Sequence, residues 1–314
     1  MGKRSRWDPY LLGILYACVT SVLWGTVGIL LKVASQVLGP ASLVCLRALV
    51  AFSLLLPFMV YFHRSKFKFR RPPLALLIAG CCLASNYFAF IKGVALSSAS
   101  NAQVLSQAGP ILLVLFGTLI LKEKICWQQF GGILCSILGF LLFYRDQVST
   151  LAIDSTLYQE GVRWVLLSAL FWATYAIVAK KIVGSIDPHM MNLFFHGLTT
   201  MLFLPFIDLT SLSHLALSQW LLVVFLGLYT LIAYGTLAVA FTHVPASTVG
   251  MIIAVNPMIC VIVMKILQMA HVTWLNPESI HLTGYFGAAL SLLGVLIVIR
   301  FSTRHLAQEA YSDS

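Results

Sequence analysis

The chain has 314 residues, of which 60% are hydrophobic and only 10% are charged, and its mean hydropathy is +0.94. These values exclude an ordinary soluble domain, since apolar runs of roughly 20 residues, the length that crosses a hydrocarbon core, recur along the chain. The formal net charge of +10 does not indicate a nucleic-acid partner, because the basic residues are concentrated in short loops. We therefore expect an integral membrane protein whose partners are the lipid bilayer and a small-molecule substrate, with no nucleic acid.

The apolar runs predict ten transmembrane helices, at residues 11–31, 41–62, 73–92, 99–121, 125–144, 162–182, 189–207, 219–241, 246–268 and 280–301. Lys3, Arg4 and Arg6 before the first run imitate a signal peptide. The run continues to Leu31 without a clear cleavage site, so we expect a retained first span. The predicted organisation is an N-terminal tail (1–10), a first five-helix repeat (11–144), an external linker (145–161), a second five-helix repeat (162–301) and a C-terminal tail (302–314).

The charged loop residues predict how this arrangement is oriented. One side of the ten spans receives the basic residues Lys3, Arg4, Arg6, Arg64, Lys66, Lys68, Arg70, Arg71, Lys122, Lys124, Lys180, Lys181, Arg300 and Arg304. The other side receives Asp146, Asp154, Glu160 and Asp208. Because Lys and Arg accumulate in cytoplasmic loops, both termini are predicted to be cytoplasmic. The compact size and short tails favour a bacterial inner (plasma) membrane.

Two stretches, residues 99–110 and 246–257, resemble one another at a constant shift of 147: both begin with Ala-Ser and end at a proline in mid-run. Further pairs recur in the same order at shifts of 147, 148 or 155, namely Trp24/Trp172, Thr26/Thr174, Lys32/Lys180, Pro40/Pro188, Pro57/Pro205, Tyr87/Tyr234, Gly132/Gly287 and Gly139/Gly294. Because each predicted repeat has an odd number of spans, the second repeat has the opposite orientation in the membrane. Inverted repeats are typical of alternating-access transporters, in which substrate binds near the bilayer midplane. The predicted fold class is an all-α membrane protein with ten transmembrane helices as two inverted five-helix repeats.

Several residues also stand in a family-specific order: Trp24-Gly25, Lys32, Pro40, Arg47, the Ala99-Ser100 start, Pro110, and Leu121-Lys122-Glu123 followed by Gln129, Gly132 and Gly139. In these residues the chain resembles the EamA-like branch of the drug/metabolite transporter superfamily. The resemblance implies ten spans in two repeats and transport of a small metabolite; known classes include amino acids, sugar nucleotides, phosphorylated sugars and S-adenosylmethionine. The second half departs from the pattern, with Ala270 where a Glu would match Glu123 and Phe195 where an Arg would match Arg47.

Polar and aromatic side chains near the middle of the predicted spans form the candidate substrate site, because lipid does not satisfy such groups. Ser100, Gln103 and Gln107 are spaced to share one helix face. The full predicted set is Trp24, Asn86, Tyr87, Lys92, Ser100, Gln103, Gln107, Trp172, Tyr175, Tyr234 and Asn256. For the amides, hydrogen bonding between helices is the alternative interpretation.

Two further side chains in the spans are titratable or charged. Arg47 lies inside the second span, where it either holds the helices together, the interpretation we favour, or binds a substrate carboxylate or phosphate. His196, in the seventh span, is interpreted as a packed neutral histidine in preference to a proton carrier.

None of the ten acidic residues falls within a predicted span, whereas ion-coupled carriers usually bind the coupling ion on a buried carboxylate. We therefore expect facilitated transport or exchange of a zwitterionic or anionic metabolite, such as an amino acid or a nucleoside-bearing derivative like S-adenosylmethionine. A proton-coupled metabolite or drug exporter is the main alternative, and a channel or lipid scramblase a weaker one. No His-Glu-x-x-His, Gly-x-Ser-x-Gly elbow or metal-binding cysteine spacing is present, so we expect no enzyme, no metal and no cofactor. We expect a monomer or a homodimer.

Overall fold

The computed structural model describes residues 9–62, 73–121, 126–150, 155–182, 185–244, 246–275, 278 and 280–312. Helices and the turns that join them make up these ranges, and no strand occurs in them. The predictions for residues 1–8, for the basic segments 63–72 and 122–125, and for residues 151–154 in the middle of the linker lie outside the described residues.

The first half of the chain forms α1 (Pro9–Ala34), α2 (Pro40–Phe62), α3 (Leu74–Leu96), α4 (Ala99–Ser106), α5 (Ala108–Leu121) and α6 (Trp127–Thr150). The second half forms α7 (Ser155–Ile182), α8 (Pro188–Phe203), the short turn η2 (Leu204–Phe206), α9 (Leu209–Ser213), α10 (Leu217–His243), α11 (Ala246–Ile253), α12 (Asn256–Met269) and α13 (Leu282–Ser312). Within the described residues, α1, α2, α3, α6, α7 and α10 are long and apolar enough to cross a membrane by length and composition. The chain is therefore an all-helical membrane protein.

Two predicted spans are each split into a pair of short helices, and a proline explains each break. Proline has no N–H to donate to the carbonyl four residues earlier, and its ring clashes with that carbonyl. Four residues before Pro110 is Ser106, where α4 ends, and four residues before Pro257 is Ile253, where α11 ends. The backbone thus opens at equivalent places in the two stretches that resemble one another in sequence.

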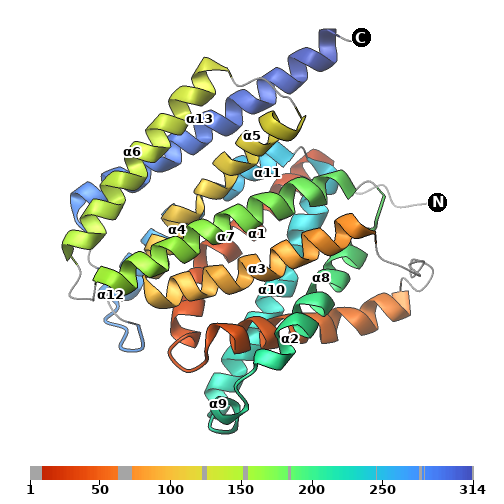
Figure 1. Cartoon of the computed structure of the whole chain (residues 1–314), viewed down its shortest axis with the longest axis vertical. Coiled ribbons are helices and arrows are strands. Elements are labelled where there is room, and N and C mark those ends of the chain that lie inside the picture. Colours follow the sequence, from red (N-terminus) through yellow and green to blue (C-terminus); the bar gives the residue numbers. More distant parts are fainter. Residues whose placement is uncertain are drawn as a thin grey trace.

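The helices pack in specific pairs: α1 lies against α10, α3 against α7, α2 against α8, and α6 against α13. In Figure 1 the α6–α13 pair forms one edge of the bundle, and α2 and α8 lie toward the opposite edge. Large apolar side chains such as Leu141 on α6, Leu221 on α10 and Phe286 on α13 are exposed on the outside of the bundle, as expected for a lipid-facing surface.

The α6–α13 contact depends on glycines. A Cβ atom added to Gly139 would lie 2.3 Å from the backbone nitrogen of Ser291 and 2.6 Å from the carbonyl oxygen of Gly287. A Cβ added to Gly132 would lie 2.8 Å from the carbonyl oxygen of Gly294. Small residues at a helix crossing let the two backbones approach closely, which is the usual way that helices pack in a membrane.

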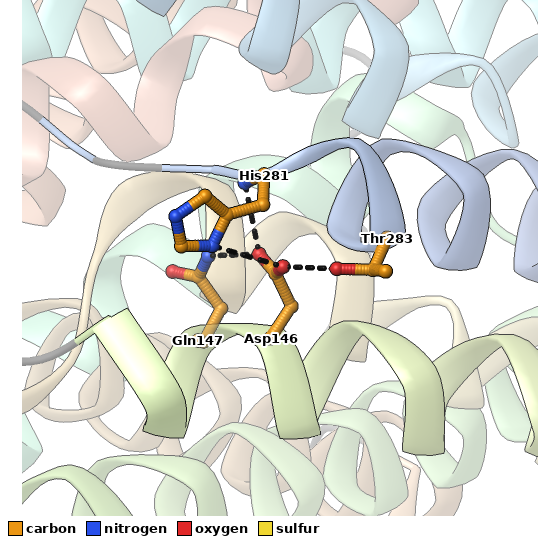
Figure 2. Close-up of polar contacts among 4 residues, drawn as sticks. All are labelled: Asp146, Gln147, His281 and Thr283. Atoms are coloured by element: carbon orange, nitrogen blue, oxygen red, sulfur yellow. Dashed lines mark hydrogen bonds and ion pairs between the residues drawn. The ribbon is translucent and has the colours of Figure 1, made fainter.

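The predicted linker is shorter in the structure, because α6 continues to Thr150 and α7 begins at Ser155. As a result Asp146, predicted as a linker charge, is buried with only 3% of the residue exposed. Its carboxylate faces the first turn of α13, where it accepts hydrogen bonds from the backbone N–H of His281 and the hydroxyl of Thr283, and lies 3.4 Å from the His281 ring (Figure 2). An anion at a helix N-terminus is favourable, since it satisfies free N–H groups and the helix dipole.

Glu278 plays the same part at another helix start. Its carboxylate accepts from the backbone N–H groups of Ala99, at 2.9 Å, and Ser100, at 3.3 Å, in the first turn of α4. On the adjoining turn, the Lys32 ammonium donates to the carbonyls of Val94, Ala95 and Ser97 at the end of α3. The α3–α4 junction is therefore closed by one cation and one anion, each matched to the dipole of its helix.

Candidate functional site

A cavity of about 130 Å³ lies in the middle of the bundle, at the level of the two helix breaks. For scale, an engineered apolar cavity of about 150 Å³ is large enough to bind benzene. Its wall is formed by Trp24, Val27, Leu31, Arg47, Asn86, Tyr87, Phe90, Gln103, Ser106, Gln107, Pro110, Ser168, Ala169, Trp172, Tyr229, Thr230, Ala233, Tyr234, Ile253 and Asn256. Both halves of the chain contribute to this wall.

The two helix breaks meet beside the cavity. Gln107, between α4 and α5, donates its side-chain N–H to the carbonyl oxygen of Ala254, between α11 and α12, at 2.7 Å. The Ala254 carbonyl, which lies at the break between α11 and α12, thus accepts a hydrogen bond from the Gln107 amide at the other break. This carbonyl is therefore not left unpaired in the bundle interior. Next to this junction the Ser21 hydroxyl donates to Asn256 Oδ1 at 2.7 Å, which fixes that amide on α12.

Aromatic rings form a second part of the wall. The Trp24 and Tyr234 rings are 5.3 Å apart between centroids, and the Tyr87 and Tyr234 rings are 5.5 Å apart in an edge-to-face arrangement. Trp172 packs against Gly109, where an added Cβ would lie 2.9 Å from the Trp172 ring. The predicted pair Trp24 and Trp172 therefore both reach the cavity, one from each half.

Two further amides are held by their N–H groups. Asn86 Nδ2 donates to the hydroxyl of Ser168 at 2.8 Å and to its carbonyl at 3.0 Å. Gln103 Nε2 donates to the Trp24 carbonyl at 2.6 Å. The amide nitrogens of the cavity wall thus tie helices together, while no described hydrogen bond uses the side-chain oxygens of Asn86, Gln103 or Gln107.

Arg47 brings a positive charge to the wall. The residue is buried, with only 7% of it exposed. Its Nε and Nη2 atoms donate hydrogen bonds to the Thr230 hydroxyl at 3.1 and 2.8 Å. The guanidinium carbon lies 5.7 Å from the centre of the Tyr87 ring. The close approach of α10 to α2 at Gly227, where a Cβ would meet Val50 at 2.4 Å, brings Thr230 within reach.

Four predicted site residues lie away from the cavity. Lys92 forms an ion pair with Glu160 at 3.2 Å and covers the Trp164 ring at 4.3 Å. Ser100 is fully buried in the first turn of α4, close to the Glu278 carboxylate. Tyr175 packs edge-to-face on Phe195, and His196 packs edge-to-face on Tyr234, both inside the core. Lys92, Ser100 and Tyr175 therefore belong to the packing of the bundle in this structure.

Sequence reasoning missed several wall residues, of which Ser106, Ser168 and Thr230 are polar. Ser106 stands three residues after the predicted Gln103, and Ser168 and Thr230 stand four residues before the predicted Trp172 and Tyr234. Residues three or four apart lie on the same helix face, so this spacing was the signal that could have found them.

The wall is mainly apolar and aromatic, with a few fixed amides, hydroxyls and one guanidinium, which is typical of a small-molecule binding site. No Asp, Glu or His contributes to it among the described residues. The described residues also contain no group of three His, Cys, Asp or Glu side chains placed to hold a metal ion. The arrangement is suited to binding a small molecule.

Comparison with known proteins assigns the chain to a family. The model of the EamA-like transporter family matches residues 11–145 and again residues 159–300. The inner membrane transporter YhbE of Escherichia coli (strain K12) is 26% identical over 91% of this chain and 90% of its own length. The S-adenosylmethionine uptake transporter of Rickettsia prowazekii is 23% identical over 62% of this chain and 64% of its own length. The pseudopaline exporter CntI of Pseudomonas aeruginosa is 23% identical over 76% of this chain and 81% of its own length.

The fold is also known from a crystal structure with a TM-score of 0.64 and 17% sequence identity, covering 96% of this chain and 99% of that one. At this identity the likeness concerns the fold alone. These relatives are named as transporters or an exporter, and YhbE as an inner membrane transporter, which agrees with an integral membrane protein that handles a small molecule. Because the family model covers both halves, the chain belongs to the EamA-like transporter family, as its residues predicted.

Proposed function

We propose that the chain is a secondary transporter that moves a small zwitterionic or anionic metabolite through the central cavity by alternating access. The observation that supports this most strongly is the meeting of the two proline breaks at the cavity, through the hydrogen bond between Gln107 and Ala254. Broken helices at a repeat interface are where carriers bind their substrates, because freed backbone groups are tolerated only in protein or beside a wet cavity.

The proposed architecture is two inverted five-helix repeats with ten spans, the pairs α4–α5 and α11–α12 each counting as one. Residues near a two-fold axis contact their own counterparts. Gln107 and Ala254 are separated by 147 residues, which is the shift between the two similar stretches. Ser136 Oγ donates to the Ser291 carbonyl at a separation of 155, which is the shift of the paired glycines in α6 and α13.

Reciprocal contacts between the repeats give further support. Gly132 approaches Gly294, and Gly139, the counterpart of Gly294, approaches Gly287, the counterpart of Gly132. Such an exchange of partners is what an isologous two-fold contact produces. The proposed orientation places both termini in the cytoplasm of a bacterial cell, with the Glu278 loop and Asp146 on the outer side.

The cavity supports a substrate with an apolar or aromatic part and few charges. Rings from Trp24, Trp172 and Tyr87 offer stacking surfaces, and one guanidinium is too few for a polyphosphate. The relative named for S-adenosylmethionine uptake has an amino-acid derivative in its name. An amino acid or an amino-acid derivative is therefore the substrate class that we propose.

The experiment is counterflow in proteoliposomes containing the purified full chain. Radiolabelled amino acids and S-adenosylmethionine are offered outside vesicles that contain the same unlabelled compound. Saturable uptake that is stimulated by internal substrate is expected of an exchanging carrier, whereas flux that does not saturate would indicate a channel.

The absence of carboxylates and histidines from the described cavity wall favours facilitated transport or exchange over proton coupling. Imposing a proton gradient on the same vesicles tests this. Uptake that follows the gradient and ignores internal substrate would replace exchange with a proton-coupled exporter.

A further inference from the structure

The guanidinium of Arg47 is only partly used by the protein. Two of its three nitrogens share a single acceptor, Thr230 Oγ1, which itself donates to the carbonyl of Leu226 at 2.7 Å. A guanidinium carries five N–H donors. The Thr230 hydroxyl oxygen therefore orients the guanidinium but leaves some of its N–H donors unused. Nη1 has no acceptor among the described residues.

In the part of the chain that the structure describes, no carboxylate forms an ion pair with Arg47. Asp146, Glu278, Asp187 and Asp208 accept hydrogen bonds at the starts of α13, α4, α8 and α9, and Glu160 pairs with Lys92. The Arg47 charge also lies over the face of the Tyr87 ring. A buried charge is ordinarily paired, because its desolvation is costly.

The fold itself does not require a cation at this position. If the repeats correspond as proposed, Phe195 on α8 stands where Arg47 stands on α2, at a shift of 148. Phe195 is 1% exposed and packs on Tyr175, so the equivalent place in the second half is filled by an apolar ring. A structural salt bridge would need a carboxylate on a facing helix, whereas among the described residues Arg47 contacts the Thr230 hydroxyl and the Tyr87 ring.

We propose that Arg47 binds a carboxylate of the transported molecule, with the Nη1 edge of its guanidinium facing into the cavity. This inference rests on the proposed function and specifies the charge that the carrier selects. A planar guanidinium matches a carboxylate bidentately. Because Thr230 already occupies Nε and Nη2 on one edge, a single carboxylate is accommodated, and a phosphate dianion would lack a second cation.

The rest of the wall complements the other end of such a substrate. Asn86, Gln103 and Gln107 each donate from the side-chain nitrogen to the protein, and no described hydrogen bond uses their side-chain oxygens, in a wall whose described residues include no Asp or Glu. Acceptor oxygens and the faces of Trp24 and Trp172 suit an ammonium or another cationic centre. The cavity wall thus has two parts. Residues on α2 and α10 would bind the anionic end of the substrate, and side-chain oxygens on α3 and α4 would accept hydrogen bonds from its cationic end.

The test uses the detergent-solubilised full chain and the twenty L-amino acids, each compared with its amino-acid amide, in which the carboxylate is replaced by a neutral carboxamide. Binding is measured by isothermal titration calorimetry. For wild type we expect at least one amino acid to bind about tenfold or more tightly than its amide, since a charge-assisted hydrogen bond is lost. This comparison requires no variant and so does not depend on the folding of a mutant.

The variants Arg47→Gln and Arg47→Lys are then compared with Lys92→Gln, which removes a cation outside the cavity. R47Q is expected to bind acid and amide alike, R47K to recover part of the preference, and K92Q to keep it. Equal binding of acids and amides by wild type, binding by no member of the panel, or an unchanged preference in R47Q would each overturn the proposal.

Counterflow separates this inference from the proposed function. If acids and amides are exchanged equally well, the carrier stands and the carboxylate site falls. If binding depends on the carboxylate but no internal compound stimulates uptake, the site stands and the exchange mechanism falls.

Discussion

The α6–α13 crossing makes a strong prediction about a single added methyl group. In Gly139→Ala the new Cβ would lie 2.3 Å from the backbone nitrogen of Ser291 and 2.6 Å from the carbonyl oxygen of Gly287. Both are backbone atoms that cannot rotate away, so the two helices must move apart by about 1 Å to restore ordinary contact. Overpacking of this kind typically costs about 1–3 kcal/mol, and we expect a clearly lower thermal midpoint in detergent.

Neighbouring glycines on α6 provide matched variants. A Cβ on Gly132 would lie 2.8 Å from the Gly294 carbonyl, so Gly132→Ala should also be destabilising, though less than Gly139→Ala. Gly131 has nothing within 4 Å of its added Cβ, so Gly131→Ala should be neutral or stabilising by up to about 1 kcal/mol through helix propensity. Thermal unfolding of the three variants side by side is the assay. If Gly139→Ala has the same thermal midpoint as Gly131→Ala, the close contact between α6 and α13 is wrong.

Three further predictions concern the helix breaks and the buried carboxylates. Gln107→Leu leaves the Ala254 carbonyl without its donor beside the cavity. We expect the rate of counterflow to fall about tenfold or more while the protein still folds. Undiminished exchange would show that this hydrogen bond has no part in transport. Burial raises the pKa of the Glu278 carboxyl above its usual range, against the opposing hydrogen bonds of Ser100 and Ala99 and the charge of Lys32. A raised acid pKa means that ionisation costs more in the folded state, so wild type should lose stability relative to Glu278→Gln as pH rises from about 4 to about 7; a pH-independent difference in thermal midpoint would refute this. Asp146→Ala removes the acceptor for the first turn of α13 and should cost about 1 kcal/mol or more, whereas Thr283→Val should cost less; equal stability of the Asp146 variant and wild type would contradict the contacts in Figure 2.

Residues 99–121 and 246–268 were each predicted as one continuous helix, and the structure splits both. A proline removes a defined hydrogen bond, which explains why α4 ends four residues before Pro110 and α11 four residues before Pro257. The family was readable from ordered residues such as Trp24 and the paired glycines, and the family model confirms it.

The helical spacing indicated which residues share a helix face, but not which of them lie at the level of the cavity along the helix axis. Ser100 and Gln107 share a helix face but are seven residues apart, about 10 Å along the axis. Gln107 reaches the cavity, whereas Ser100 lies beyond its end. Tyr175 likewise follows Trp172 on a similar face and lies past the point where the cavity closes. Periodicity specifies a direction around a helix, and only the packing of the other helices decides where along it a hollow remains.

The environment of the acidic residues was beyond sequence reasoning for a different reason. Asp146 and Glu278 stand next to segments rich in polar residues, which predicts water around them. Each is instead covered by the start of a helix distant in the chain, α13 and α4 respectively. A contact between residues separated by more than a hundred positions leaves no mark on local composition.

Side-specific cysteine labelling tests the inverted arrangement of the two halves most directly. The exposed Trp127 follows α5 and the exposed Trp274 follows α12, so they occupy corresponding connections of the two proposed repeats. Trp127→Cys and Trp274→Cys are placed one at a time in a chain whose seven native cysteines are replaced, and intact cells are treated with a membrane-impermeant maleimide. Labelling of the cysteine at 274 but not at 127 until the cells are broken is the expected result, whereas both cysteines reacting from the same side would contradict oppositely oriented repeats.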